Sequence, residues 1–402
     1  MKTKNAKKTA KKDLRLRIAA IVLTVLAIAM MMFPGVDGDG DITDKLVAVA
    51  MGIDYTDGML NVTINSVLPK SGEEGGVESV PVSQRGESVE KCLDGIEKKT
   101  GRSLELGLCG VIVVGDELAR EGMLSVMSIL LSGALVSPGV YVVQADGDSA
   151  ENIIRTSSMF AFESPTALTQ LVKSAEKSIG GCPVTLLKFV SDSYGKTETA
   201  YAPLLSVKKA PALSGSGESS SGEKFQPDAI TNNAVYKGGV MAGRLSAAAS
   251  IGLSYYGSGD TKGMLICPHF TIAGVDIGTV TAESVGSDVK VEAVFRDGAP
   301  FASLKVSVTI KSADRERVNA VAMRENLSEA QIEEAFMKNY EELIISEVRQ
   351  AYDESRAMSC DVFDIEQKLY RFHTNEYKNF IKSGGKILDE CRVEISAKIK
   401  IL

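Results

Sequence analysis

An uncharged apolar run near the N-terminus constrains this chain more than any other feature of its sequence. The run extends from Ile18 to Phe33, and its apolar character continues to Val36. A helix of this length rises ~28 Å, which is close to the thickness of a bilayer's hydrocarbon core. The sequence therefore predicts a single transmembrane helix over residues 18–36.

The charges beside this run predict its orientation. Residues 1–17 carry eight basic side chains and a single acidic one. Basic segments next to a membrane helix stay on the cytoplasmic side, so the chain from about residue 37 onward is expected on the outer face. Residues 37–44 are expected to form an acidic stalk. They do not fit a calcium-binding loop, because Ile42 stands where that loop needs glycine.

A cleaved signal peptide is the alternative to this anchor. Ala27, Ile28 and Ala29 match the A-x-A pattern of a cleavage site and follow a short apolar run. The anchor is favoured because the apolar stretch continues past that point to Phe33. No cysteine lies near the end of the run, which excludes a lipid-modified cysteine as the anchor.

The rest of the chain is acidic. The whole sequence has 45 basic and 52 acidic residues and a net charge of −7, and leaving out residues 1–17 leaves 37 basic and 51 acidic residues. A basic N-terminal segment ahead of an acidic chain is typical of a signal that sets membrane topology. A nucleic-acid-binding protein carries its basic residues on the folded domain, so we expect no nucleic-acid partner.

Residues that could carry catalysis or hold a metal are sparse. His269 and His373 are the two histidines and lack zinc-site spacing, and no nucleophile elbow or P-loop occurs. The six cysteines lie far apart. They either form disulfide bonds of an exported domain or are buried free thiols. Free thiols are favoured because a protein with a large hydrophobic core does not need disulfide bonds for stability. A couple between Cys267 and His269 is conceivable, but residues two apart on a strand are not forced into a hydrogen bond. We expect no catalysis, no cofactor and no metal.

Hydrophobic patterns predict an α/β domain over residues 45–207. It begins with a hairpin of two β-rich runs that turns at Asp57 and Gly58. Residues 71–87 are rich in Gly, Glu and Ser and are expected to be a loop. Helices and strands alternate after this loop, which favours a mixed sheet flanked by helices. The expected elements are a helix over 88–99, a strand over 108–115, a helix over 117–131, a strand over 140–144 and mostly helix over 150–179.

A low-complexity linker over residues 208–227 is expected to end this domain. A small middle domain, residues 228–280, would then begin with a hairpin. The C-terminal domain, residues 281–402, has a long helix that opens with a Ser328–Gln331 capping box and a second helix capped by Asp361. We expect both helices on one face of an antiparallel sheet formed by strands at 289–295, 303–311 and 393–401.

Four stretches of the sequence, each weakly specific, occur in an order that is informative. They are Lys45–Asp54 with its hairpin, Ser88–Glu121 with Thr100-Gly-Arg102 inside it, Ala234–Leu245, and the helix–helix–strand ending that contains Cys360–Phe363. In this order they resemble the C-subunit (Ger(x)C) family of spore germinant receptors, over most of residues 42–402. The chain departs from the family's pattern in three ways: a membrane helix replaces the lipid-modified cysteine, Ser132-Gly133-Ala134 replaces an Arg-Asp pair, and tryptophan is absent.

The resemblance implies a fold of three mixed α/β domains after one N-terminal transmembrane helix. It implies a subunit of a membrane-associated nutrient receptor that acts in spore germination by binding and coupling, without catalysis. The implied partners are integral membrane subunits, one of them transporter-like, at the bacterial cell membrane or the inner membrane of the spore. Two alternatives remain open: an extracytoplasmic adaptor or binding protein of the same fold, and a membrane-tethered hydrolase.

The resemblance also points to five framework or interaction candidates. They are Gly52, Asp54, Arg102, Gly115 and Gly243. We expect the glycines among them to permit tight backbone turns and not to bind a ligand.

Overall fold

The computed structural model describes most of the chain after residue 43, namely residues 44–69, 77–133, 135–160, 166–176, 178–209, 225–227, 230, 232–257, 262–312 and 314–402. The predicted basic segment, the predicted membrane span and nearly all of the predicted stalk lie outside these residues. Within them, no helix is both long enough and apolar enough to cross a membrane. Leu46–Leu402 form one compact unit.

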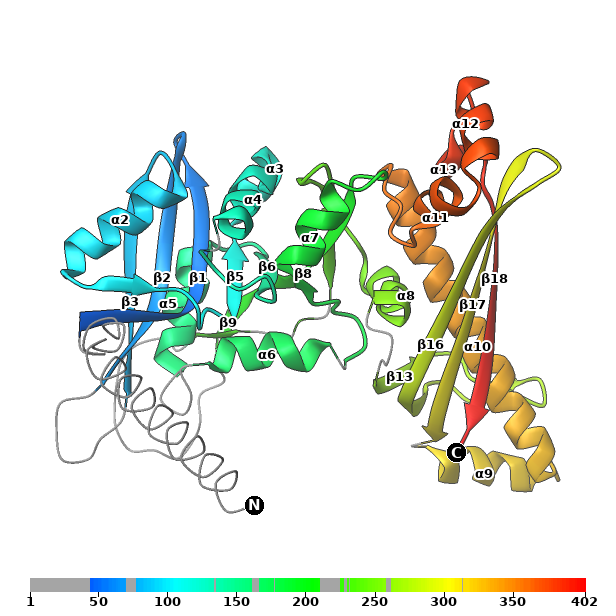
Figure 1. The fold of residues 1–402 in the computed structure, drawn as a ribbon. Helices are drawn as coiled ribbons and strands as arrows, with labels where there is room; N and C mark the ends of the chain where they lie inside the picture. The colour runs from blue at the N-terminus through cyan, green and yellow to red at the C-terminus, as the bar shows by residue number, and fades with distance from the viewer. Residues whose placement is uncertain are drawn as a thin grey trace, which may run out of the picture. The chain divides into compact units, whose positions relative to one another are not determined.

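A ten-stranded mixed sheet dominates the first half of this unit (Figure 1). Its main path runs in the order β12-β11-β8-β6-β5-β1-β2-β3, and β4 and β7 pair with β1 and β6 beside that path. Strands β1, β5, β6 and β8 are mutually parallel, and β2, β3, β11 and β12 are added antiparallel. The strands are β1 (Lys45–Thr56), β2 (Met59–Pro69), β3 (Val77–Gly86), β4 (Ser103–Glu105), β5 (Val111–Val114), β6 (Tyr141–Ala145), β7 (Val184–Thr185), β8 (Thr199–Leu205), β11 (Asn233–Lys237) and β12 (Val240–Arg244).

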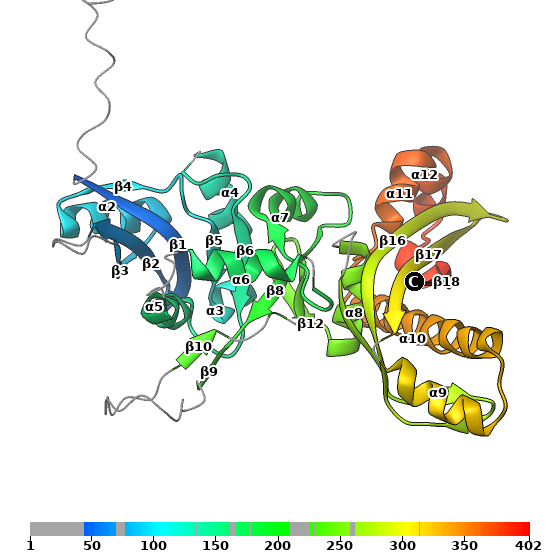
Figure 2. The same cartoon turned by 90° about the horizontal axis from the view of Figure 1, so that it is seen from below.

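Helices cover both faces of this sheet, because its central strands are apolar on both sides. Ile112 and Val114 of β5 pack in the core beneath one set of helices, and Val111 and Val113 pack in the core on the opposite face. The first core includes residues of α2 (Val89–Thr100), α3 (Asp116–Glu121), α4 (Leu124–Ser132) and α7 (Leu186–Ser193). The second includes residues of α5 (Ala150–Phe160) and α6 (Ala167–Ala175), which lie on the face seen in Figure 2.

Several predicted elements are confirmed here. The first hairpin turns at Asp57 and Gly58, which have φ angles of 54° and 76°. Helix α2 begins after Ser88, whose side chain accepts a hydrogen bond from the backbone N–H of Lys91. The hairpin between β11 and β12 turns at Gly238 and the glycine after it.

Two predictions for this half were wrong. Residues 71–87 were expected to be a loop, but β3 occupies Val77–Gly86 as the edge strand of the sheet. An edge strand tolerates polar residues and proline, because one of its sides has no partner strand. The helix expected over residues 117–131 is two helices, since Gly122 has a φ angle of 120° and the N–H of Met123 donates to Gly239 instead of continuing the helix.

The second half of the unit is built on a four-stranded sheet in the order β13-β16-β17-β18. The predicted capping box is confirmed: Ser328 and Gln331 exchange hydrogen bonds at the start of the 29-residue helix α10. The strands are β13 (Gly263–Cys267), β16 (Val280–Arg296), β17 (Ala299–Ser312) and β18 (Arg392–Ile401), and the helices are α8 (Ala247–Gly257), α9 (Arg315–Arg324), α10 (Glu329–Ala357), α11 (Ile365–Phe372), α12 (Thr374–Lys382) and α13 (Ile387–Glu390). Two short ribbons complete the described residues, β9 (Val207–Lys209) with β10 (Phe225–Pro227) and β14 (Thr271–Ile272) with β15 (Val275–Asp276).

The sheet of the C-terminal half is mixed, where an antiparallel sheet was expected. Strand β18 runs parallel to β17, with Phe301 opposite Arg392 and Ile310 opposite Ile401. Between them the chain passes through α9 to α13 and so can return to the same end of the sheet. A parallel pair needs a crossover connection of this kind, whereas an antiparallel pair can be joined by a tight turn.

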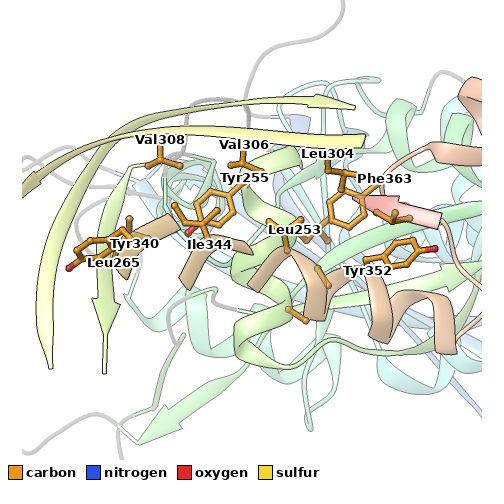
Figure 3. Packing of buried hydrophobic residues seen from close by; sticks show 14 of the residues in the cluster. Leu253, Tyr255, Leu265, Leu304, Val306, Val308, Tyr340, Ile344, Tyr352 and Phe363 are labelled. Atoms are coloured by element: carbon orange, nitrogen blue, oxygen red, sulfur yellow. The ribbon is translucent and has the colours of Figure 1, made fainter. Parts of the chain in front are cut away.

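The core of this half lies between the sheet and two helices. Leu304, Val306 and Val308 alternate along β17 and face Tyr340 and Ile344 of α10 (Figure 3). Helix α8 joins the same core, and it contributes Leu253 and Tyr255. This helix approaches α10 very closely at Gly252, where an added Cβ would lie 2.1 Å from the backbone oxygen of Glu347.

The expected domain boundaries stay a prediction. Strands β11 and β12 complete the large sheet, although they follow the expected linker. Helix α8 and β13 pack with the smaller sheet. Residues 228–280 therefore contribute to both halves of the unit.

The close approach of α8 to α10 predicts that Gly252→Ala destabilises the protein. Alanine favours a helix by ~1 kcal/mol over glycine, but overpacking against a backbone atom costs ~1–3 kcal/mol or more, so we expect a net loss of about 2 kcal/mol. Urea unfolding of both proteins measures this loss. Gly139→Ala is the control, because its Cβ would meet no atom nearer than 3.7 Å. Equal stability of the two variants would contradict the packing described here.

Candidate functional site

Four polar side chains and one glycine lie at the carboxyl ends of the parallel strands β1, β5 and β6. In open α/β sheets this edge is where ligands usually bind, so these residues form the candidate site. We call them the strand-end site. They are Asp54 from β1, Gly115 and Asp116 after β5, and Gln144 and Asp146 at the end of β6.

Asp54 fixes the start of helix α5. Its carboxylate accepts hydrogen bonds from the backbone N–H groups of Ala150, at 2.8 Å, and Glu151, at 2.9 Å. These donors are orphan groups of a helix N-terminus, so the contact both satisfies them and places a negative charge at the positive end of the helix dipole. Burial raises the pKa of Asp54 above its ordinary value, although the two backbone hydrogen bonds act in the opposite direction.

Two of the predicted glycines make this contact sterically feasible. An added Cβ at Gly115 would lie 2.2 Å from the Oδ1 atom of Asp54, and one at Gly52 would lie 2.9 Å from Cγ1 of Ile154 in α5. Neither glycine has a positive φ angle. The structure therefore gives close approach, and not a tight turn, as the reason for glycine at these positions.

The other two candidates lie elsewhere. Gly243 is in β12, where an added Cβ would lie 2.7 Å from the sulfur of Met358. Arg102 is half-buried in the turn between α2 and β4, and it makes no hydrogen bond or ion pair with any residue that the structure describes. The structure thus brings Gly52, Asp54 and Gly115 together and leaves Arg102 and Gly243 apart from them.

A second network at this edge centres on Asp116. Its carboxylate accepts hydrogen bonds from Nε2 of Gln144 at 2.9 Å, from Arg244 at 2.8 Å and from Arg120 at 3.0 Å. Burial alone would raise the pKa of Asp116, but the two guanidinium groups hold it below its ordinary value. Arg244 also pairs with Asp146 at 2.9 Å, so one side chain from β12 binds the ends of both β5 and β6.

Tyr236 of β11 also belongs to this network. Its hydroxyl donates to Oε1 of Gln144, and both side chains are fully buried. Asp116, Gln144, Tyr236 and Arg244 were not among the residues predicted from the sequence. A glutamine at the end of an otherwise apolar strand was the available signal for Gln144, while nothing in the sequence indicates that Arg244 reaches two strands that precede it by about a hundred residues.

Hydrogen bonds continue from this network to the helices of the C-terminal half. Ser246, just after β12, donates from its backbone N–H and its hydroxyl to Glu354 of α10, at 2.8 and 2.7 Å. The backbone N–H of Asp361 donates to the hydroxyl of Thr199 in β8, at 3.0 Å. The Asp361 carboxylate caps α11 through the N–H groups of Ile365 and Glu366, which confirms its predicted role.

Two buried carboxyl groups lie in this region. Burial raises the pKa of Glu347 to about 7, and the hydroxyl of Tyr255 donates a hydrogen bond to it at 2.9 Å. Burial also raises the pKa of Asp361 to about 7, against the effect of its backbone hydrogen bonds. Both groups therefore bind a proton more strongly in the folded protein than in the unfolded chain.

The geometry around His269 does not form a catalytic couple with Cys267. The imidazole of His269 is 82 % exposed and lies 3.1 Å from Asp276, whereas Cys267 is buried. All six cysteines are buried free thiols. Among the described residues, no group of three or more His, Cys, Asp or Glu side chains is placed to hold a metal ion. The polar groups of the strand-end site are hydrogen-bonded to α3, α5, β11 and β12, so the arrangement joins elements of the fold.

Comparisons with known proteins relate both halves of the chain to spore germination proteins. Residues 39–207 match the family described as spore germination protein N-terminal domain, and residues 231–402 match the one described as spore germination B3/GerAC like, C-terminal. A solved structure titled "Crystal Structure of the GerBC protein" is similar, with a TM-score of 0.50 and 17 % identity over 90 % of this chain and 100 % of that one. No curated protein matches the chain. At this identity the likeness to the solved structure shows a shared fold.

The contact between Gly115 and Asp54 predicts non-additive mutations. Gly115→Ala should destabilise the protein by about 2 kcal/mol through overpacking, and Asp54→Ala should cost about 1–2 kcal/mol through loss of the cap. The double variant should lose clearly less than the sum, because removing the Asp54 carboxylate makes room for the new methyl group. Urea unfolding of the wild type, the two single variants and the double variant measures these losses. Strictly additive losses of stability would refute the contact between Gly115 and Asp54.

The buried carboxyl group of Glu347 predicts a pH dependence of stability. Its ordinary pKa of 4.5 is raised to about 7 in the fold, so the folded state binds the extra proton and stability falls as pH rises from about 4.5 through 7. Between these pH values, ionisation of Glu347 should lower the free energy of unfolding by on the order of 2–3 kcal/mol. Glu347→Gln should remove this pH-dependent loss. Denaturant unfolding at pH 5, 6, 7 and 8 measures it.

Glu354 on the same helix provides a control of opposite sign. Burial would raise its pKa, but hydrogen bonds from Ser246 and Gln350 lower it below the ordinary value. The stability that it contributes is present above its unfolded pKa and is lost as the pH falls through its folded pKa. Glu354→Gln should therefore weaken the protein at neutral pH, where Glu347→Gln stabilises it. Parallel pH profiles for the two variants would show that the burial of Glu347 is misassigned.

Proposed function

Because the chain belongs to the C-subunit (GerAC-like) family of spore germinant receptors, we propose that it works as one subunit of a membrane-associated nutrient receptor. It would act in spore germination by binding its partners and coupling their movements, without catalysis. The partners would be integral membrane subunits, one of them transporter-like. The bridge that Arg244 makes between Asp116 and Asp146 is the observation that best supports this proposal.

This bridge matters because it links the two segments that match the family. Asp116 and Asp146 belong to residues 39–207, whereas Arg244 belongs to residues 231–402. The guanidinium group holds the ends of β5 and β6 against β12, and Ser246 next to it is hydrogen-bonded to α10. A displacement of either segment would break charge-assisted hydrogen bonds, which are stronger and more directional than neutral ones. The network therefore suits a protein that passes a structural change from one of these segments to the other.

The framework candidates fit this role in different ways. Gly52, Asp54 and Gly115 hold α5 against the strand ends, so we assign them to the framework of the first half. Gly243 lets the side chain of Met358, after α10, pack against β12. Arg102 is assigned to partner binding, because its guanidinium has no partner among the described residues.

The membrane attachment rests on the sequence. Residues 1–17 would stay in the cytoplasm, residues 18–36 would span the membrane once, and the body would lie on the outer face, as the basic and apolar segments predict. This topology would place the body beside the exposed surfaces of integral membrane subunits. The expected division at residues 45–207, 228–280 and 281–402 is part of the same proposal.

Germination assays with an Arg244 series test the receptor role. A strain that lacks the gene is complemented with the wild-type chain, Arg244→Ala or Arg244→Lys, and germination is measured with nutrients and with a non-nutrient trigger. The strain without the gene should fail to respond to at least one nutrient. Arg244→Ala should slow that response roughly fivefold or more, because losing both ion pairs removes coupling on the order of 1–3 kcal/mol.

Arg392→Ala is the matched control, since the side chain of Arg392 is 79 % exposed and, among the described residues, forms an ion pair with Glu394 alone. It should germinate as the wild type does, and Arg244→Lys should fall between the wild type and Arg244→Ala. Immunoblots of spore membranes would confirm equal amounts of each chain. Normal nutrient responses in the strain without the gene would overturn the receptor role and favour an adaptor of the same fold.

A further inference from the structure

Helices α11 and α12 form a short helical hairpin that projects from the smaller sheet (Figure 1). The rings of Tyr370 and Tyr377 lie 5.5 Å apart, and the hydroxyl of Tyr377 donates to Glu366 at 2.7 Å. Phe380 contacts Phe295 of β16, with ring centroids 5.7 Å apart. These contacts hold both helices in place, so the side chains on the outer side of the hairpin are presented in a defined arrangement.

The charge of this hairpin is opposite to that of the chain as a whole. Helices α11 and α12, residues 365–382, carry four basic residues and two acidic residues, whereas the whole chain has a net charge of −7. Three of these four cations, Arg371, Lys378 and Lys382, make no ion pair with a carboxylate among the described residues, and the fourth, Lys368, donates a hydrogen bond to the hydroxyl of Tyr256. In the first half of the chain, Lys91, Lys98 and Lys188 are each paired with an acid four residues away on the same helix, whereas Lys99 and Lys173 make no ion pair among the described residues.

Exposed apolar side chains lie among these cations. Phe372 is 73 % exposed at the end of α11, and Tyr370 and Ile381 are 40 % and 41 % exposed. Ile381 adjoins Lys382 and lies one helical turn from Lys378, and Arg371 lies 5.9 Å from the ring of Phe372. A single exposed apolar residue is common in proteins, but a rigid tip that combines three of them with unpaired cations is not an ordinary solvated surface.

We propose that the α11–α12 hairpin docks on an anionic lipid surface. Lys and Arg side chains that lack internal partners are attracted to acidic headgroups, and aromatic and aliphatic side chains beside them enter the boundary between headgroups and acyl chains. An acidic protein would pair with the cations but would not need the apolar groups to be exposed around them. The inference uses residues that the proposed receptor role does not use, so each can fail without the other.

The absence of tryptophan from the chain provides a local probe. Phe372→Trp introduces a single indole at the tip of the hairpin in the full-length protein. With vesicles of phosphatidylglycerol and phosphatidylcholine, its emission should shift to shorter wavelength and be quenched by brominated acyl chains. Vesicles of phosphatidylcholine alone should give neither effect. Leu108→Trp, at a site that is 68 % exposed in the first half of the chain, is the control and should respond to neither vesicle.

Charge neutralisation completes the test. Adding Arg371→Gln, Lys378→Gln and Lys382→Gln to the Phe372→Trp protein should lower the ratio of lipid-bound to water-exposed indole about a hundredfold, at about fivefold for each cation. Raising the salt concentration to 1 M should also weaken the signal. Neutralising Lys91, Lys98 and Lys188 instead should leave it unchanged. An unshifted Phe372→Trp emission, an equal shift with neutral vesicles, or a shift that only soluble polyglutamate produces would overturn the proposal.

Discussion

Strand β11 pairs with β8 through five residue pairs, from Asn233 opposite Pro203 to Lys237 opposite Thr199, and thereby joins two parts of the chain separated by a low-complexity segment. The other contacts between these two parts of the chain depend on this pairing. It places Tyr236 under Gln144, and it brings β12, with Arg244, to the ends of β5 and β6. Without it, the buried side chains of Tyr236 and Gln144 would lose their hydrogen bond, at a cost of about 1–3 kcal/mol for each group left unpaired.

Close backbone contacts and buried carboxyl groups recur inside each half of the unit. Gly52 and Gly115 let α5 approach the sheet, and Gly252 lets α8 approach α10. At each place a carboxylate lies nearby, Asp54 in the first case and Glu347 in the second, and burial raises the pKa of both. Burial of a charge opposes folding unless hydrogen bonds compensate. These contacts therefore fix the positions of the helices at some expense of stability.

Local signals predicted much of the fold. The Asp57-Gly58 turn, the Ser328–Gln331 capping box and the Asp361 cap are all found where the sequence indicated, because each depends on residues within a few positions of one another. Strand β3 was missed because an edge strand with proline and polar residues lacks the apolar signal of a central strand. The direction of β18 was missed because the hydrophobic alternation of a strand is the same in parallel and antiparallel pairs.

The sequence by itself determined the mixed α/β class, the family resemblance and three residues of the strand-end contact, Gly52, Asp54 and Gly115. Only the tertiary structure decided why those residues belong together, and that Arg244 holds Asp116 and Asp146. The physical reason is the separation along the sequence of the residues that interact. Turns, caps and amphipathic periods are encoded within a few residues, whereas a hydrogen bond between side chains about a hundred residues apart exists only after strand order and register have brought them together.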